Sequence, residues 1–169
     1  KAVVTFCLFF LASGTFQVKQ FNIAEIAWET TLKVDKPTQN TVIGTQMHTA
    51  GMIAIDVINK RLFPELIPNI TLTVDSVADH ITPATAVLAM INFALDGHTL
   101  VVGTPLSSIS TSTGLAATEY KVAQLSAIAS TSAVLDTKKY PYFSRVGSPG
   151  GDLVLGMISF IVNNKKNCQ

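Results

Sequence analysis

The chain has 169 residues, a length that suits one compact domain with its own core. Apolar residues make up 48% of the sequence and charged residues 14%, a balance that excludes a disordered chain. The formal net charge is +1, so no strongly acidic or basic partner is implied. The pairs Lys138-Lys139 and Lys165-Lys166 have no aromatic residues interleaved with them, so nucleic-acid binding is not expected.

The N-terminal segment has the layout of a secretory signal peptide. Lys1 precedes the apolar run Ala2–Ala12, and small residues follow it. We therefore expect a signal peptide over approximately residues 1–17; the alternative is a buried strand of a cytosolic domain. The run is too short for a comfortable membrane span. Because the first residue is not Met, we also expect the N-terminal end to be incomplete.

Two further features fit a secreted chain. Cys7 falls within the predicted signal peptide, so Cys168 would remain as an odd cysteine with its partner beyond Gln169. The triplet Asn69-Ile70-Thr71 is an N-glycosylation acceptor, which makes Asn69 a candidate glycosylation site.

The remaining sequence alternates between strand and helix patterns. In chain order we expect a strand at 21–28, a helix at 41–62, a strand at 70–74, a helix from 82 to a stop at 97, a strand at 99–102, a helix at 107–120, strands at 122–128 and 143–146, and a helix at 152–163. Thr82 and Pro83 form a good helix start, and Gly97 a good stop. This alternation predicts an α/β fold with a doubly wound parallel sheet.

Ligands of such sheets bind beyond the carboxyl ends of the strands, which directs attention to two loops. Gly103–Thr111 and Ala129–Ser132 are rich in hydroxyl groups, and each follows a predicted buried strand. Free amides at a helix N-terminus, surrounded by hydroxyl groups, can hold a carboxylate or another small anion. The alternative is ordinary helix capping, for which Ser and Thr are the usual residues.

Catalytic patterns are absent from the sequence. It contains neither a G-x-S-x-G elbow nor a phosphate-binding loop that ends in Gly-Lys-Ser/Thr. The histidines His48, His80 and His98 are not at metal-ligand spacing with one another. We therefore expect no enzyme activity, catalytic residue, metal or cofactor. Arg145 is expected to pair with a nearby carboxylate, the alternative being that it faces a ligand.

Three stretches resemble a known family in the same order. Ala50–Asn59 is similar to its first helix, and Val101–Gly103 followed by Ser107–Ser110 to its strand and loop. Ser126–Leu135 and then Tyr140–Val146 resemble the segment that comes next. The family is the receptor-family ligand-binding region, of the type I periplasmic-binding fold. It occurs in class C G-protein-coupled receptors and natriuretic peptide receptors.

The resemblance implies that residues 18–169 are the first lobe of a clamshell domain, incomplete at the C-terminus. A second lobe would supply the other wall of the cleft. We expect the extracellular ligand-binding region of a membrane receptor, attached to the membrane through segments downstream. Its small-molecule ligand would be a small carboxylate or amino-acid-like, and closure of the clamshell would signal across the membrane. A receptor cyclase is one form of such a receptor. The alternative is a solute-binding protein of a transporter.

The resemblance also implies site residues. Relatives hold the carboxylate of an amino-acid ligand through a serine and a second hydroxyl residue, which match Ser107 and Ser130, with Ser108 and Thr131 beside them. The loop after Gly103 is one residue longer than in the relatives, and a cysteine that often follows the second strand is missing. Many relatives dimerise through first-lobe helices, so a dimer of that kind is one alternative here.

Overall fold

The computed structural model describes residues 19–27, 39–63, 70–78 and 82–164. The strands are β1 (Lys19–Ala27), β2 (Ile70–Ala78), β3 (Leu100–Val102), β4 (Ala123–Ser126) and β5 (Phe143–Arg145). The helices are α2 (Gln39–Asn59), α3 (Pro83–Leu95), α4 (Ser107–Tyr120) and α5 (Gly150–Asn163), with a short 3-10 helix η2 (Ala133–Leu135). The predicted signal peptide, Asn69 and both cysteines lie outside the described residues.

The five strands form one parallel sheet in the order β2-β1-β3-β4-β5. The chain moves from β1 to β2 on one side and then returns past β1 to β3, β4 and β5 on the other. This reversal makes the sheet doubly wound, so the predicted fold class is confirmed. Because the strands are parallel, the loops that follow β3 and β4 leave the sheet at the same edge.

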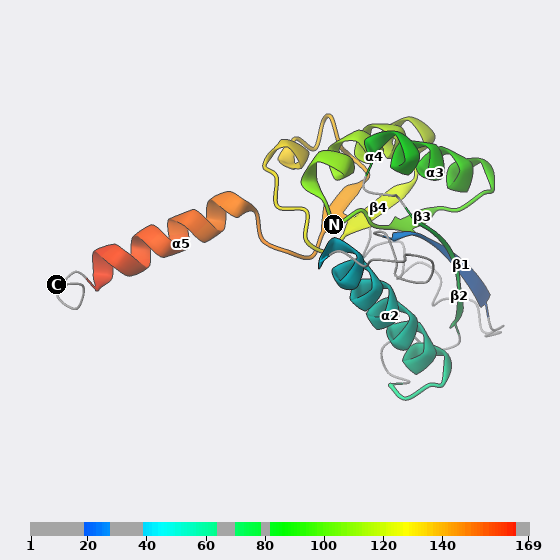
Figure 1. The fold of residues 1–169 in the computed structure, drawn as a ribbon. Helices are drawn as coiled ribbons and strands as arrows, with labels where there is room; N and C mark the ends of the chain where they lie inside the picture. The colour runs from blue at the N-terminus through cyan, green and yellow to red at the C-terminus, as the bar shows by residue number, and fades with distance from the viewer. Residues whose placement is uncertain (1–18, 28–38, 64–69, 79–81, 165–169) are drawn as a thin grey trace, which may run out of the picture.

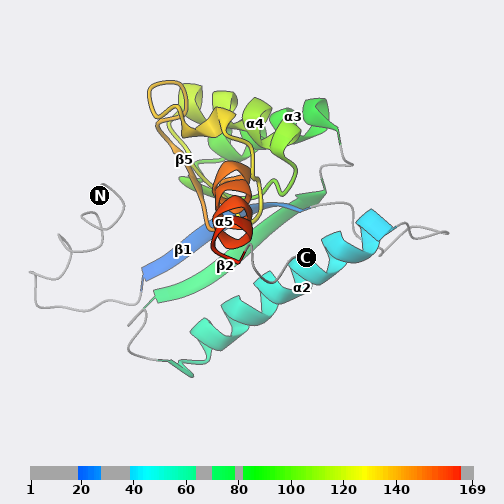
Figure 2. The same cartoon turned by 90° about the vertical axis from the view of Figure 1, so that its left-hand side faces the viewer.

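Helices lie on both faces of the sheet (Figure 1, Figure 2). α3 and α4 pack side by side against one face, and α2 lies against the other face along β1 and β2. The main core lies between the sheet and the α3–α4 layer. It consists of Ala24, Ile26, Ala86, Ala89, Met90, Phe93, Val101, Ile109, Ala117 and Val122.

Local chemistry sets both ends of α3, as predicted. The hydroxyl of Thr82 accepts a hydrogen bond from the amide of Thr85 at 3.4 Å, and Pro83 occupies the first helical position. Gly97 follows the helix with a φ of +88°. The amides of Gly97 and His98 donate to the carbonyls of Ala94 and Phe93, the pair of bonds that defines a Schellman motif.

Other element ends differ from the sequence prediction. α2 ends at Asn59 rather than residue 62, and the Asn59 side chain makes two 2.8 Å hydrogen bonds with the backbone of Leu72 on β2. β2 runs to Ala78 because it pairs with β1 along its whole length. β4 ends at Ser126 rather than residue 128, since the Ser126 hydroxyl accepts from the amide of Ala129 and stabilises a turn there.

α5 extends away from the sheet (Figure 1). It has no buried residue, although it carries many apolar side chains. Within the described part of the chain, no helix has both the length and the apolar character that a membrane crossing requires.

Candidate functional site

The two hydroxyl-rich loops meet at the carboxyl edge of the sheet. The Oγ atom of Ser107, the first residue of α4, accepts hydrogen bonds from the amides of Ser130 at 3.1 Å and Thr131 at 3.2 Å. Ser107 and residues 130–131 come from loops after different strands, so the sheet topology brings them together. We call Ser107 and the backbone of Ser130 and Thr131 the Ser107 cradle.

Each member of the cradle has a different role. Both acceptor positions of the Ser107 hydroxyl are used by the two amides, which leaves its O–H free to donate. The Thr131 hydroxyl accepts from the amide of Ala133 at 3.2 Å and so caps the turn into η2. That bond matches the capping alternative for this residue. Ser108 is exposed beside the cradle.

The start of α4 adds backbone donors beside the cradle. Leu106 is the N-cap residue and makes no side-chain capping bond. The first amides of a helix have no partner within the helix, and the N-terminus carries a partial positive charge. The free hydroxyl proton of Ser107 and these amides therefore present hydrogen-bond donors to one region.

A buried polar network lies beneath the cradle. The carbonyl of Thr104 accepts from the hydroxyls of Ser110 at 2.6 Å and Ser126 at 2.7 Å. The three side chains are 0% exposed. Since each buried hydroxyl has a partner, the network fixes the loop after β3 against β4. Ser126 in turn holds the amide of Ala129, which begins the second loop.

Gln124 extends this network along β4. Its side-chain nitrogen, Nε2, donates to the carbonyl of Gly103 at 2.9 Å and to the hydroxyl of Thr113 on α4 at 2.8 Å. Sequence reasoning missed both Gln124 and Ser126. A signal was present, because polar residues at alternate positions of a predicted buried strand point to the same face.

Arg145 holds the second loop from the side of β5. Its Nη1 atom donates to the carbonyls of Ala129 at 3.1 Å and Thr131 at 2.8 Å. The expectation that it pairs with a carboxylate is wrong for the described residues, where its partners are these carbonyl oxygens. The amide of Gly150, the first residue of α5, donates to the carbonyl of Ser130 at 2.9 Å.

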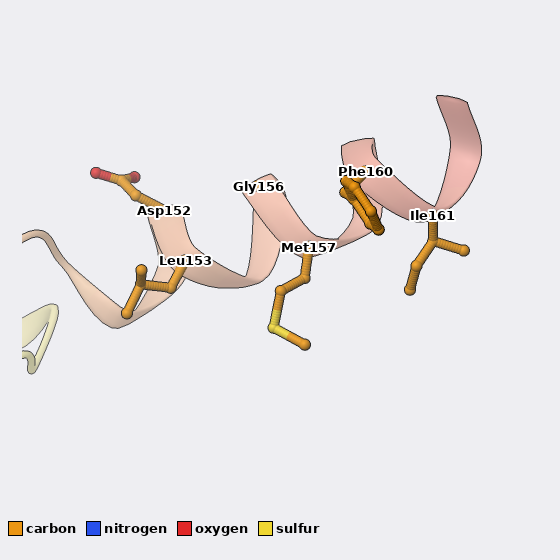
Figure 3. Close-up of a pocket in the computed structure, with 6 residues that line it drawn as sticks. All are labelled: Asp152, Leu153, Gly156, Met157, Phe160 and Ile161. Carbon is orange, nitrogen blue, oxygen red and sulfur yellow. The ribbon is translucent and has the colours of Figure 1, made fainter. Parts of the chain in front are cut away.

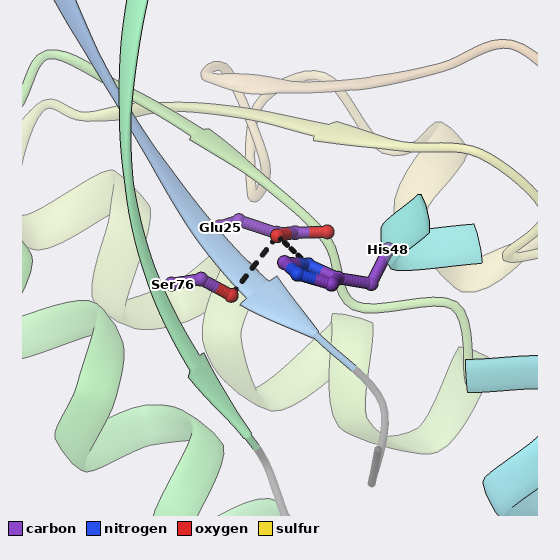
Figure 4. Close-up of polar contacts among 3 residues, drawn as sticks. All are labelled: Glu25, His48 and Ser76. Atoms are coloured by element: carbon purple, nitrogen blue, oxygen red, sulfur yellow. Dashed lines mark hydrogen bonds and ion pairs between the residues drawn. The ribbon is translucent and has the colours of Figure 1, made fainter. Parts of the chain in front are cut away.

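A second polar cluster lies under α2 on the opposite face of the sheet (Figure 4). The Oε2 atom of Glu25 lies 2.6 Å from Nδ1 of His48 and accepts from the hydroxyl of Ser76 at 2.9 Å. The Ser76 hydroxyl bonds the carboxylate and not the imidazole, so no nucleophile–base pair is formed. The cluster fastens α2 to β1 and β2.

A second histidine–carboxylate pair joins His98, just after α3, to Asp75 on β2. Their Nε2 and Oδ2 atoms are 3.1 Å apart. No group of three or more His, Cys, Asp or Glu side chains in the described ranges could hold a metal ion. The two histidine pairs join α2 to β1 and the end of α3 to β2.

A pocket lies along α5 (Figure 3). Its lining consists of Asp152, Leu153, Gly156, Met157, Phe160 and Ile161. All six residues belong to one exposed helix, and the lining is largely apolar. A surface with a single wall and few polar groups does not have the form of a small-molecule site.

Comparison with known proteins identifies one family. Residues 46–163 match the model of the receptor family ligand binding region. The matched region is more than half of the chain and runs from α2 through the whole Ser107 cradle to the end of α5. No curated protein matches the chain.

Proposed function

We propose, since the chain belongs to the receptor family of ligand-binding regions, that its Ser107 cradle binds the carboxylate of a small ligand. The family is one of ligand-binding regions of receptors, which fits a site whose described residues offer hydrogen-bond donors and place no general base beside the Ser107 hydroxyl. The ligand class we propose is an amino acid or a similar small carboxylate. The reaction is binding alone, with no bond made or broken.

The proposal is based on the two hydrogen bonds that the Ser107 hydroxyl oxygen accepts. Two backbone amides of one loop converge on the hydroxyl oxygen at the start of α4. A carboxylate accepts hydrogen bonds through both of its oxygens, so it can accept from the Ser107 hydroxyl and from the amides of the first turn of α4. Ser108 adds an exposed hydroxyl at the same place.

The proposed mechanism in the receptor is closure around the ligand. The described sheet and its helices provide one wall of a cleft, and a second lobe provides the facing wall. A ligand that contacts both walls binds the closed state more tightly and so shifts the population towards it. We propose that this domain lies outside the cell and that its closure signals across a membrane.

The test is a calorimetric titration of the protein with amino acids, each compared with its own carboxamide. We expect the carboxylates to bind and the carboxamides to bind at least about tenfold more weakly, since charge-assisted hydrogen bonds are the stronger ones. Ser107→Ala removes the hydroxyl donor and lowers the affinity by about tenfold.

The matched control is Ser132→Ala in the second loop, because the Ser132 hydroxyl makes no capping bond and is exposed. This variant is expected to bind like the parent protein. Equal binding of carboxylates and carboxamides, or equal affinity of the Ser107→Ala and Ser132→Ala variants, would show that the cradle is not the site.

A further inference from the structure

Arg145 is tied to the cradle through a single peptide group. The carbonyl of Ala129 accepts from Arg145, and the amide nitrogen of the same peptide group, that of Ser130, donates to Ser107. This peptide bond is trans. In a planar trans peptide the C=O and N–H groups point in opposite directions. Holding the carbonyl towards Arg145 therefore turns the Ser130 amide towards Ser107.

The next peptide group is held in the same way by a different donor. The carbonyl of Ser130 accepts from the amide of Gly150, while the amide of Thr131 donates to Ser107. Two independent anchors thus set the directions of the two amides that meet at Ser107. Of these anchors, only Arg145 carries a charge.

No carboxylate of the described residues balances the charge of Arg145, whose hydrogen bonds go to the carbonyl oxygens of Ala129 and Thr131. Its Nη2 atom is buried and has no hydrogen-bond partner in the described part of the chain. A buried guanidinium group without a counter-ion is costly, and a nearby anion lowers that cost. The guanidinium charge also polarises the Ala129–Ser130 peptide, which strengthens the Ser130 amide as a donor.

We infer that Arg145 is a positioning residue for the ligand site: it directs the Ser130 amide to Ser107 and supplies the positive charge that makes the site select anions. This inference rests on the proposed function of the Ser107 cradle. Arg145 acts through the 129–131 loop and needs no direct contact with the ligand.

The first test needs no ligand. Arg145→Met removes the charge and the donors at a similar chain length, whereas Arg145→Lys keeps the charge. Amide hydrogen exchange is measured at Ser130 and at Thr131. We expect exchange at Ser130 to rise about tenfold in Arg145→Met, because one charge-assisted bond is lost, and to be partly restored in Arg145→Lys. Thr131 retains the Gly150 anchor and should change less.

The second test uses acetate as the anionic probe and acetamide as its neutral counterpart, at constant ionic strength. We expect the Kd for acetate to rise about tenfold in Arg145→Met and to be partly recovered in Arg145→Lys, while acetamide binding is unaffected. A purely structural role would make acetate and acetamide binding change together.

The outcomes separate this inference from the proposed function. If the parent protein binds no acetate, the proposed function fails and anion selection fails with it, while the exchange ratio still decides the positioning role. If acetate binds and Arg145→Met changes neither its Kd nor Ser130 exchange, the inference is wrong and the proposed function stands. Equal Kd values for acetate and equal Ser130 exchange in the Arg145→Met and Arg145→Lys variants would also show that the inference is wrong.

Discussion

Gly103 lies against the backbone of β1, directly after β3. A Cβ atom at this position would lie 2.3 Å from the carbonyl oxygen of Ile26 on β1. Its φ of +127° lies in a region that residues with a side chain rarely adopt. The Gly103 amide meanwhile donates to Leu125 on β4 at 2.9 Å. Glycine is therefore needed where the first cradle loop leaves the sheet.

Replacing Gly103 with alanine is predicted to lower the free energy of unfolding by about 3 kcal/mol, because strain and steric overlap both contribute. Gly97→Ala is the matched control. Gly97 also has a positive φ, but nothing lies within 4 Å of its added Cβ atom. It should cost only about 1–2 kcal/mol. Urea unfolding of both variants measures the difference, and equal costs would contradict this account of Gly103.

Some contacts of the candidate site could be predicted from the sequence, and others could not. The contact between Ser107 and Ser130 was foreseeable, because parallel topology places both loops at one edge and the family resemblance selects these two serines. The partners of Arg145 were not foreseeable, because they are backbone carbonyls whose direction depends on the folded loop. The Thr104–Ser126 bond likewise joins residues from different loops.

Among the helices, α4 ends in an unfavourable conformation. Lys121 adopts the left-handed region with a φ of +57°. The amides of Lys121 and Val122 donate to the carbonyls of Thr118 and Ala117, so the residue takes the place that glycine usually fills at a helix end. For a residue with a side chain, this conformation costs free energy.

Lys121→Gly is therefore predicted to raise the free energy of unfolding by about 0.5–1 kcal/mol. Lys121→Ala is the control, since alanine keeps the Cβ atom and gains nothing from the change. Thermal unfolding of both variants and of the parent protein measures the change in the free energy of unfolding. If Lys121→Ala stabilises the protein as much as Lys121→Gly does, relief of the left-handed conformation is not the cause of the stabilisation.

For the helices, the end of an element could be predicted where residues close to it in sequence set that end. The ends of α3 were predicted because Thr82, Pro83 and Gly97 act on neighbouring backbone groups. The end of α2 was not, because Asn59 bonds to Leu72 on another element, β2. The end of β4 was not predicted either, although the Ser126–Ala129 bond at that end is local. The alternating pattern predicted a parallel sheet, but the strand order β2-β1-β3-β4-β5 was not predicted, because alternation and crossover handedness together allow more than one order.

For the whole molecule, the core and α5 differ in the burial of their apolar side chains. One group fills the core between the sheet and the α3–α4 layer, whereas the side chains of α5 are exposed. Two phenylalanines mark the contrast, since Phe93 is 5% exposed and Phe160 is 66% exposed. Burial, rather than residue type, should therefore decide their contributions to stability.

Phe93→Ala is predicted to lower the free energy of unfolding by about 3–5 kcal/mol, while Phe160→Ala should change it by less than about 0.5 kcal/mol. Urea unfolding monitored by circular dichroism compares them directly. A cost at Phe160 close to that at Phe93 would mean that α5 packs against the rest of the molecule in solution.

We propose that the loops after β3 and β4 form one carboxylate site at Ser107. The most direct measurement is amide chemical-shift mapping during an acetate titration at constant ionic strength. We expect the largest saturable shifts at Ser130, Thr131 and the first turn of α4, and we expect that acetamide does not reproduce them. An absence of saturable shifts there, or larger shifts on α2 or α5, would contradict it.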